Sequence, residues 1–540
     1  MSIPDRTSSV APGVPVSIDA RDAFFQRDHL LTDLRGHSAR AGLATAIGQV
    51  LRLGIRISTI PVLNRLLTPD DVGVFTIVAG FTVLAAMFSL SGLTTVTVQR
   101  QRLTHAEASS LFWLNIGLGA ALALLVLLAS PVLAAFYNDP RLGPVCMVMS
   151  VTILLSSGSL QHQAILTRQM RARTLSAIDV STQAAGIAAA IALAWTGAGY
   201  WALVVQPLVS QALLGISLVL ACRWVPSRPR LVRGIGQMAS SGMMLTWCNV
   251  VGTFRAQVDL GAVAKVFGTE AAGAYSRSYS VLQLPVMQFV QPMAQVAIPM
   301  LSLLVTDTPR LRAAWRQLQE KLALVVVPPL VGLIATSDLS VRILLGPQWN
   351  ESARIFAVLG VLGVVQPVFI AHHWMYIACD RSRAMLTANL ASLALVVVGS
   401  LGPIALAGWW PWLRDPMAVA VGVTMMWTVV GVPWQFWHTS RSTPLTIHDL
   451  TSSLAPAFVY GAVVLVACLV LRRLVSFSAQ SLSGAVIGLS ACVAVSLLAC
   501  ALFYAVVPAF RSPVSSAIEL AAGPVLRRLR RSSPNTGDAE

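Results

Sequence analysis

Apolar runs of about 20 residues recur along this chain at short intervals, and they restrict its fold more than any other feature of the sequence. A run of that length is what an α-helix needs to cross roughly 30 Å of hydrocarbon. The composition agrees, because 56% of the residues are hydrophobic and only 11% are charged. Period-2 alternation typical of a β-barrel is not found. The sequence therefore predicts an all-α membrane protein.

We expect about fourteen membrane-spanning helices. They are predicted over residues 42–63, 72–93, 110–135, 144–166, 177–197, 200–222, 240–264, 273–303, 321–345, 354–379, 384–407, 416–438, 454–474 and 483–508. About 40 mostly polar residues precede the first span and two arginines interrupt it, so we do not expect a cleaved signal peptide.

The distribution of basic residues between the spans predicts the orientation. With the N-terminus inside, most arginines fall in inner loops. The outer loops hold far fewer, namely Arg65, Arg141, Arg342, Arg354, Arg414, Arg472 and Arg473. By the positive-inside rule, both termini are predicted to be cytoplasmic. Much of the net charge of +16 follows from this topology, so nucleic-acid binding is not expected.

Sequence signatures of catalysis are missing. The chain has no Walker A sequence, no GxSxG, no HExxH and no DDxxD-type pair for Mg²⁺. Its seven cysteines lie in or at the ends of apolar spans without CxxC spacing, and we expect buried thiols there, neither disulfides nor metal ligands. The Asp70–Asp71 pair after Pro69 is expected to cap the following helix. We therefore predict that the protein is not an enzyme and needs no cofactor.

The chain also repeats itself. Residues 65–75, RLLTPDDVGVF, align without a gap with residues 265–275, KVFGTEAAGAY. Both copies lie on the same predicted side of the membrane, which predicts a parallel repeat of about six helices, as in transporters built from two lobes. The predicted parts are a cytoplasmic segment (1–41), an N-lobe (42–235), a C-lobe (236–445), an extra helix pair (446–508) and a basic cytoplasmic tail (509–540).

Polar side chains share one face of the first span. They follow at steps of 4, 3, 4 and 3 residues and are Thr45, Gln49, Arg52, Arg56 and Thr59. A guanidinium at the bilayer centre costs roughly 2.5 to 3.5 kcal/mol. We expect a hydrated cavity that receives an anion as compensation. The alternative is a structural role for the two arginines through Asp179 or another distant carboxylate.

The second lobe carries a corresponding set of polar residues. Arg255 and Asp259 lie four residues apart in the seventh span, where an intrahelical ion pair is the alternative to a functional role. The eighth span carries Arg277, then Gln288, Gln291 and Gln295 on a common face, with Pro285 and Pro292 as predicted kinks. His372 and His373 point to different faces of the tenth span, so at most one is expected to function and packing is favoured. The candidates for ion coupling are Asp259, Asp179 and His372.

Three segments carry a family resemblance: RLLTPDDVGVF after the first span, VDLGAVAKVFGTEAAGAYSRSYSVLQLPVMQFVQPMAQVAIPMLS in the second lobe, and LLGPQWNESARIF after the ninth span. Over most of residues 40–440 the chain resembles the polysaccharide transport and Wzx-type flippase branch of the multidrug/oligosaccharidyl-lipid/polysaccharide (MOP) superfamily. Many members of this branch have twelve spans, so the extra pair is a departure.

The resemblance implies a V-shaped, two-lobed transporter in the bacterial inner membrane, similar in design to the peptidoglycan-precursor flippase. Such a protein moves an undecaprenyl-diphosphate-linked oligosaccharide from the cytoplasmic to the periplasmic leaflet, for O-antigen, capsule or exopolysaccharide synthesis. The arginines that line the cavity in this family correspond to Arg52, Arg56, Arg255 and Arg277.

The residues themselves agree with that substrate, because guanidinium forks match diphosphate oxygens. H⁺ or Na⁺ is a candidate counter-ion, and the basic tail with Arg527, Arg528, Arg530 and Arg531 is expected to contact anionic lipids. A polysaccharide polymerase or export machinery is a candidate partner. The alternatives are a drug or metabolite exporter of the same superfamily, or a membrane enzyme such as a polysaccharide ligase or polymerase.

Overall fold

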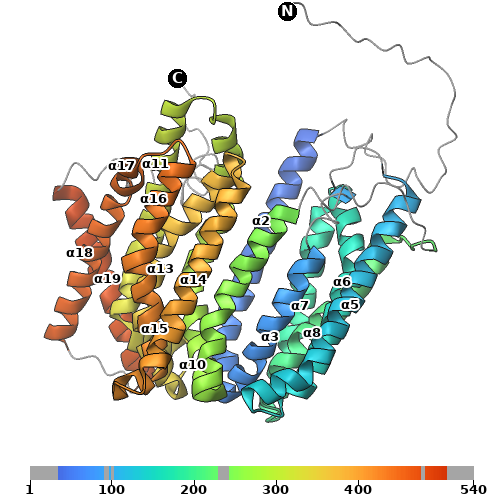
Figure 1. Ribbon diagram of the computed structural model, residues 1–540, viewed down its shortest axis with the longest axis horizontal. Helices are drawn as coiled ribbons and strands as arrows, with labels where there is room; N and C mark the ends of the chain where they lie inside the picture. The colour runs from blue at the N-terminus through green and yellow to red at the C-terminus, as the bar shows by residue number, and fades with distance from the viewer. Residues whose placement is uncertain (1–33, 91–96, 99–102, 229–242, 476–480, 507–540) are drawn as a thin grey trace, which may run out of the picture.

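The computed structural model describes residues 34–90, 97–98, 103–228, 243–475 and 481–506, and these ranges are almost wholly helical (Figure 1). The helices before residue 228 are α2 (Leu34–Leu66), α3 (Pro69–Leu90), α5 (His105–Tyr137), α6 (Leu142–Arg168), α7 (Ala172–Trp195) and α8 (Trp201–Cys222). Those from residue 243 to 442 are α10 (Met243–Leu303), α11 (Thr308–Ala335), α12 (Ser337–Leu344), α13 (Asn350–Ala378), α14 (Ser382–Leu406), α15 (Pro416–Met425), the π-helix η4 (Met426–Gly431) and α16 (Val432–Ser442). The last are α17 (Ile447–Ser452), α18 (Ala455–Leu474) and α19 (Leu482–Val506), and two short 3₁₀ turns are η2 (Pro347–Trp349) and η3 (Pro411–Arg414).

Side chains at the helix ends explain where several helices begin. At the start of α3, the Asp71 carboxylate accepts hydrogen bonds from the Thr68 backbone N–H (3.0 Å) and hydroxyl (2.7 Å). In return the Thr68 hydroxyl accepts from the Asp71 N–H at 3.2 Å. The predicted cap is thereby confirmed, with Asp71 as the capping acid. Thr104 and Glu107 form the same reciprocal arrangement at the start of α5.

The all-α membrane fold predicted from the sequence is confirmed. In the described ranges, eleven helices are long and apolar enough to cross a membrane, or up to twelve if the bent helix α10 counts as one span. Every predicted span overlaps a helix, although 321–345 is divided between α11 and α12, and 416–438 among α15, η4 and α16. α10 covers both 240–264 and 273–303 for the residues described, with non-helical Gly268 (φ 88°) between them. The arginine-bearing α2 is not one of the eleven, so the number fourteen stays a prediction.

Two groups of helices lie side by side (Figure 1). We call α2, α3 and α5–α8 the N-bundle and α10–α16 the C-bundle, and the extra pair α18–α19 packs on α11 and α12 at the outer edge of the C-bundle. The two bundles come together at one end, where α3 packs along α10. We call this the closed end; it comprises residues 65–76, 136–141, 265–276 and 343–349.

Several predicted segments fall at the limits of the described ranges. α2 begins at Leu34, before the predicted residue 42, so part of the expected N-terminal segment is helical. The predicted boundary at 235/236 and the basic tail 509–540 lie outside the described residues. All seven cysteines have free thiols, and five of them are buried.

Candidate functional site

The polar face of α2 is accessible along most of its length. Thr45, Gln49 and Arg56 are exposed, and Arg52 and Thr59 are half-buried. The helix packs mainly along α7, where a Cβ atom on Gly48 would lie 2.9 Å from the Ser176 Cβ. The side of α2 that carries Thr45, Gln49 and Arg56 is exposed among the described residues, so this side can face an aqueous space or lipid.

Arg52 contacts Asp179, the distant carboxylate that the sequence analysis considered as a structural partner. Its Nη1 donates to Asp179 Oδ2 on α7 at 2.8 Å, and the two side chains keep 31% and 28% of their surface exposed. An arginine has five N–H donors, so this single hydrogen bond leaves most of the guanidinium available to a ligand. The pair is therefore accessible rather than sealed in the protein.

Arg56 lies one helical turn further on and is exposed. In the part of the chain that the structure describes, no carboxylate oxygen lies within 4 Å of its guanidinium. The sequence predicts that α2 crosses the membrane, and a charge in such a helix normally pairs with another group or faces water. Arg56 is thus the clearest cationic group on this face.

The intrahelical ion pair considered for Arg255 and Asp259 is not formed within 4 Å. Asp259 is buried and accepts a hydrogen bond from the Tyr275 hydroxyl at 2.8 Å and from the Leu260 N–H at 2.9 Å. The Arg255 guanidinium lies 4.9 Å from the centre of the Trp427 ring, a cation–π contact.

A polar pocket surrounds Arg255 inside the C-bundle. The pocket has a volume of about 100 Å³, and its polar lining comes from Arg255, Tyr279, Gln366 and His373. His373 Nε2 lies 2.9 Å from the Asn389 Oδ1, while Gln366 Oε1 is buried and has no hydrogen-bond partner in the described ranges. This space is smaller than the few hundred Å³ of a typical small-molecule site.

The other predicted residues of α10 are spread along its second half. Arg277 is half-buried, and its Nε has no partner among the described residues. Gln288 and Gln295 are exposed, and the side chain of Gln291 lies outside the described part. The helix axis bends by 46° between Trp247–Val290 and Pro292–Leu303, which agrees with the predicted kink at Pro292.

The two histidines of α13 have different surroundings. His372 is fully buried, contacts the Val368 carbonyl through Nδ1 and lies between the rings of Trp315 and Phe436. This is the packing environment that the sequence analysis favoured. It is the neighbouring His373 that borders the polar pocket.

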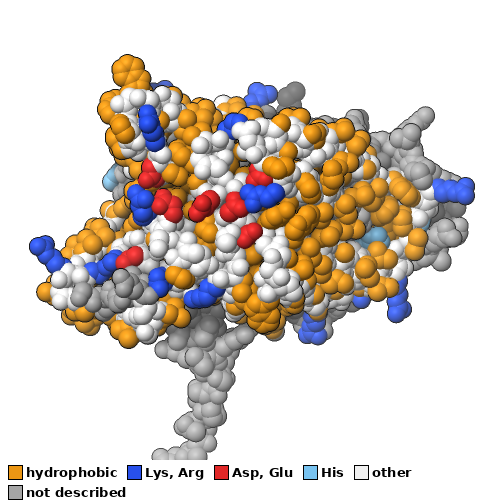
Figure 2. Space-filling view, turned by 90° about the horizontal axis from the view of Figure 1, so that it is seen from below, with side chains coloured by type: hydrophobic (Ala, Val, Ile, Leu, Met, Phe, Trp, Pro, Cys, Tyr) orange, Lys and Arg blue, Asp and Glu red, His pale blue; other side chains and the backbone are white. Residues whose placement is uncertain are grey.

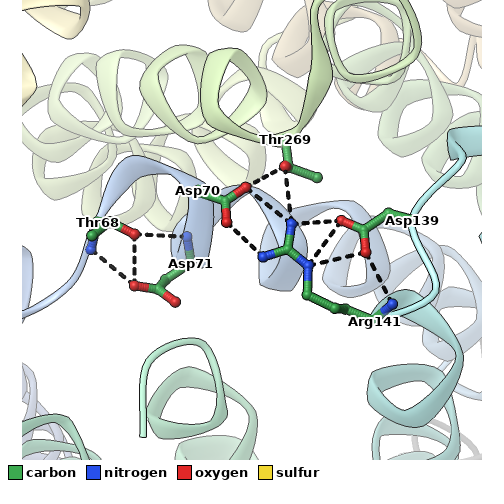
Figure 3. Close-up of polar contacts among 6 residues, drawn as sticks. All are labelled: Thr68, Asp70, Asp71, Asp139, Arg141 and Thr269. Carbon is green, nitrogen blue, oxygen red and sulfur yellow. Dashed lines mark hydrogen bonds and ion pairs between the residues drawn. The ribbon is translucent and has the colours of Figure 1, made fainter. Parts of the chain in front are cut away.

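A charged network ties the closed end together (Figure 3). Arg141, between α5 and α6, binds Asp70 of α3 through both terminal nitrogens, at 2.6 and 3.1 Å, and Asp139 at 2.7 Å. The Thr269 hydroxyl of α10 donates to Asp70, so the network reaches from one bundle to the other. Both carboxylates raise the pKa of Arg141, which stays charged at any physiological pH.

The two copies of the sequence repeat meet at this end. A Cβ atom on Gly73 would lie 1.8 Å from the Thr269 carbonyl oxygen, and one on Gly273 would lie 1.7 Å from the Pro69 carbonyl oxygen. The hydroxyls of Ser276 and Thr76 are 3.3 Å apart. Only glycine allows so close an approach of α3 to α10.

Contacts to backbone carbonyls extend the closed end on both sides. Arg65 donates to the Ile343 oxygen at 2.9 Å, and Lys265 donates to the Phe136 oxygen. Arg65 and Lys265 are aligned positions of the repeat, so each bundle makes the same kind of contact to the other. Figure 2 views the molecule from this end and shows acidic side chains gathered across its centre, with basic side chains beside them.

The arrangement of the two helix bundles is found in known membrane proteins. In fold the chain is similar to the lipid II flippase MurJ in an inward closed conformation, with a TM-score of 0.61 and 15% identity over 86% of this chain and 99% of that one. It is also similar to an inward-facing multidrug resistance MATE family transporter of the MOP superfamily, with a TM-score of 0.56 and 14% identity over 74% of this chain and 94% of that one. The chain therefore shares the multi-pass helical fold of these two proteins.

The family follows from the sequence match. Residues 62–354 match the family model described as polysaccharide biosynthesis protein, and the chain belongs to this family. It is 25% identical to the lipopolysaccharide biosynthesis protein WzxC of Escherichia coli, over 60% of this chain and 66% of WzxC. It is 25% identical to the teichuronic acid biosynthesis protein TuaB of Bacillus subtilis (67% of this chain, 77% of TuaB) and 24% identical to the succinoglycan biosynthesis transport protein ExoT of Rhizobium meliloti (72% and 78%). The resemblance inferred from the sequence is confirmed, and the expectation of a transporter rather than an enzyme agrees with it.

Proposed function

We propose that the protein is a flippase that moves an undecaprenyl-diphosphate-linked oligosaccharide from the cytoplasmic to the periplasmic leaflet by alternating access. The observation that carries this proposal is the exposed guanidinium of Arg56 on α2, one turn from the half-exposed Arg52. The family supports a polysaccharide precursor as the substrate, since the relatives are named as proteins of lipopolysaccharide, teichuronic acid and succinoglycan biosynthesis.

The diphosphate binds to the two arginines of α2. Arg56 is free to receive phosphate oxygens in a bidentate manner, and the substrate then replaces Asp179 as the partner of Arg52. This exchange costs little, because the Arg52–Asp179 pair is already partly hydrated. Arg255 and Arg277 are the cationic residues that the C-bundle contributes to the same pathway.

The glycan and the lipid tail occupy different surroundings. Sugar hydroxyls contact the polar side chains that follow α2 and the second half of α10, namely Thr45, Gln49, Thr59, Gln288, Gln291 and Gln295. The prenyl tail stays in the hydrocarbon between the bundles, because its transfer to water is unfavourable.

Alternating access requires the closed end to open. With both termini cytoplasmic, the closed end faces the periplasm, and the conformation described here receives substrate from the cytoplasmic side. Breaking the contacts of Gly73, Gly273 and the Arg141 network then opens the periplasmic side, with the bend at Pro292 as a hinge.

The membrane potential, negative inside, favours export of an anion by roughly 2.3 kcal/mol per charge per 100 mV. Inward movement of H⁺ or Na⁺ adds to this if Asp259, Asp179 or His372 exchanges the ion. Of the three, Asp259 requires the Tyr275 hydroxyl to move away first. The basic tail binds anionic lipids, and a polymerase or export machinery is the partner on the periplasmic side of the pathway.

The test is leaflet movement in liposomes of defined orientation. Purified full-length protein is reconstituted with a fluorescent lipid-linked oligosaccharide, and the glycan exposed on each leaflet is measured. Arg56→Ala should reduce the rate at least tenfold with normal protein yield. The matched control is Arg310→Ala, because Arg310 is 79% exposed and pairs only with Asp307 in the described ranges. Equal rates for both variants would refute the role of Arg56.

A further inference from the structure

An apolar groove lies between the two bundles, and none of the residues that line it belongs to α2. It has a volume of about 330 Å³ and is formed by α3 and the end of α5 on one side and by α10 and α14 on the other. Its lining includes the exposed side chains of Phe81, Phe136, Phe254, Val266 and Leu401. Exposed apolar side chains around a groove are typical of a site that another molecule covers.

The length of the groove matches one half of a bilayer. Along α10 the groove extends from Phe254 to Val266, a separation of twelve residues, which corresponds to about 18 Å at 1.5 Å per residue. The hydrocarbon core is about 30 Å thick, so one leaflet contributes about 15 Å. An acyl chain of a single leaflet therefore fits the groove from end to end.

A positive charge stands at the closed-end mouth of the groove. Lys265 is exposed, its ammonium donates to the Phe136 carbonyl, and it lies 4.7 Å from the centre of the Phe136 ring. An ammonium group has three donors, so at least one remains for a further acceptor. Lys265 lies at the closed end of the apolar lining, next to Phe136 and Val266, where a lipid headgroup would lie.

We propose that this groove binds one anionic phospholipid, with an acyl chain in the groove and the phosphate on Lys265. The lipid contacts α3 and α5 of one bundle and α10 and α14 of the other, so it stabilises the closed end. The proposal concerns a lipid that stays bound during transport and is independent of the identity of the transported substrate.

Native mass spectrometry of the purified full-length protein titrated with phosphatidylglycerol or phosphatidylcholine tests this. The chain has only two lysines, Lys265 and Lys321, which provides a matched control. We expect one retained phosphatidylglycerol in the wild type, about fivefold weaker binding in Lys265→Gln and no change in Lys321→Gln. Lys265→Arg should bind as the wild type does, because it keeps the charge.

A second variant tests the groove independently of the charge on Lys265. Ala262 lines the groove, and Ala262→Phe should displace the bound lipid although Lys265 is unchanged. Three results would overturn the proposal: equal binding of phosphatidylglycerol and phosphatidylcholine, equal effects of the two lysine variants, or a lipid retained by Ala262→Phe. The first of these would indicate lipid that contacts the groove without selection by charge.

Discussion

The close approach of α3 to α10 provides a direct test of the closed end. A Cβ atom at residue 73 would lie 1.8 Å from the Thr269 carbonyl oxygen, whereas real Cβ contacts essentially never fall below 3.0 Å. In Gly73→Ala the two helices must therefore separate by about 1.2 Å or more, since the obstacle is backbone and cannot rotate away. Overpacking of this kind costs roughly 1 to 3 kcal/mol.

Such a cost shifts the balance between conformations. If the closed end opens and closes as a two-state element, 1 to 3 kcal/mol corresponds to roughly a 5- to 150-fold loss of the closed form. We expect Gly73→Ala to lower the population with α3 and α10 in contact and to slow transport, because the cycle must pass through that state.

Cross-linking measures this population. The hydroxyls of Thr76 and Ser276 lie 3.3 Å apart, so Thr76→Cys with Ser276→Cys, in a background without the native cysteines, should form a disulfide readily. Gly73→Ala should reduce the rate of disulfide formation at least fivefold. The control Gly54→Ala adds a Cβ with nothing within 4 Å and should have no effect. Equal cross-linking rates in both variants would show that the helices do not need this contact.

Three further predictions follow from individual contacts. Arg141→Ala leaves the carboxylates of Asp70 and Asp139 without their cation and should reduce the cross-link between positions 76 and 276 several-fold. Arg141→Lys should retain part of the cross-link, and no change in Arg141→Ala would exclude a role of the network in closure. In the liposome assay, Asp179→Asn frees Arg52 and should preserve transport or accelerate it, while Arg52→Ala should abolish it; loss of transport in Asp179→Asn with normal thermal stability would contradict the proposed exchange of partners. Asp71→Ala removes the carboxylate that accepts from Thr68 at the start of α3 and should lower stability by about 1 kcal/mol, seen as a lower melting temperature in detergent. An unchanged melting temperature would show that this carboxylate does not stabilise the helix.

The helices and the polar face of α2 could be predicted from the sequence because both depend on local periodicity. Apolar length defines the spans, and steps of three and four residues place Arg52 and Arg56 on one face whatever the rest of the chain does. The two additional turns of α2 before residue 42 were missed because they contain Arg35, His37, Ser38 and Arg40, and a hydropathy criterion ends a helix where polar residues become frequent.

The partners of the charged residues could not be predicted in the same way. Asp179 lies 127 residues from Arg52, and nothing in the sequence selects it over other carboxylates until α2 and α7 pack together. The Arg141 network was missed for the same reason. A usable signal was present, since an arginine two residues after Asp139 in an outer loop that is otherwise poor in basic residues indicates a specific local partner.

The parallel repeat of two six-helix lobes stays a prediction, and the contacts at the closed end are those that such a repeat would make. Equivalent positions of two related halves can touch each other only on a two-fold axis. Thr76 and Ser276 are equivalent at an offset of 200 residues and touch, and Gly73 contacts Thr269 as Gly273 contacts its equivalent, Pro69. The charges differ between the two aligned segments, because Arg141 binds Asp70, whereas the aligned acid, Glu270, is exposed. If the two bundles separate about this axis, the contacts of Gly73 and Gly273 must break together. The Arg141–Asp70 ion pair has no counterpart at Glu270 among the described residues, so the free-energy cost of breaking it arises on one side of the axis only.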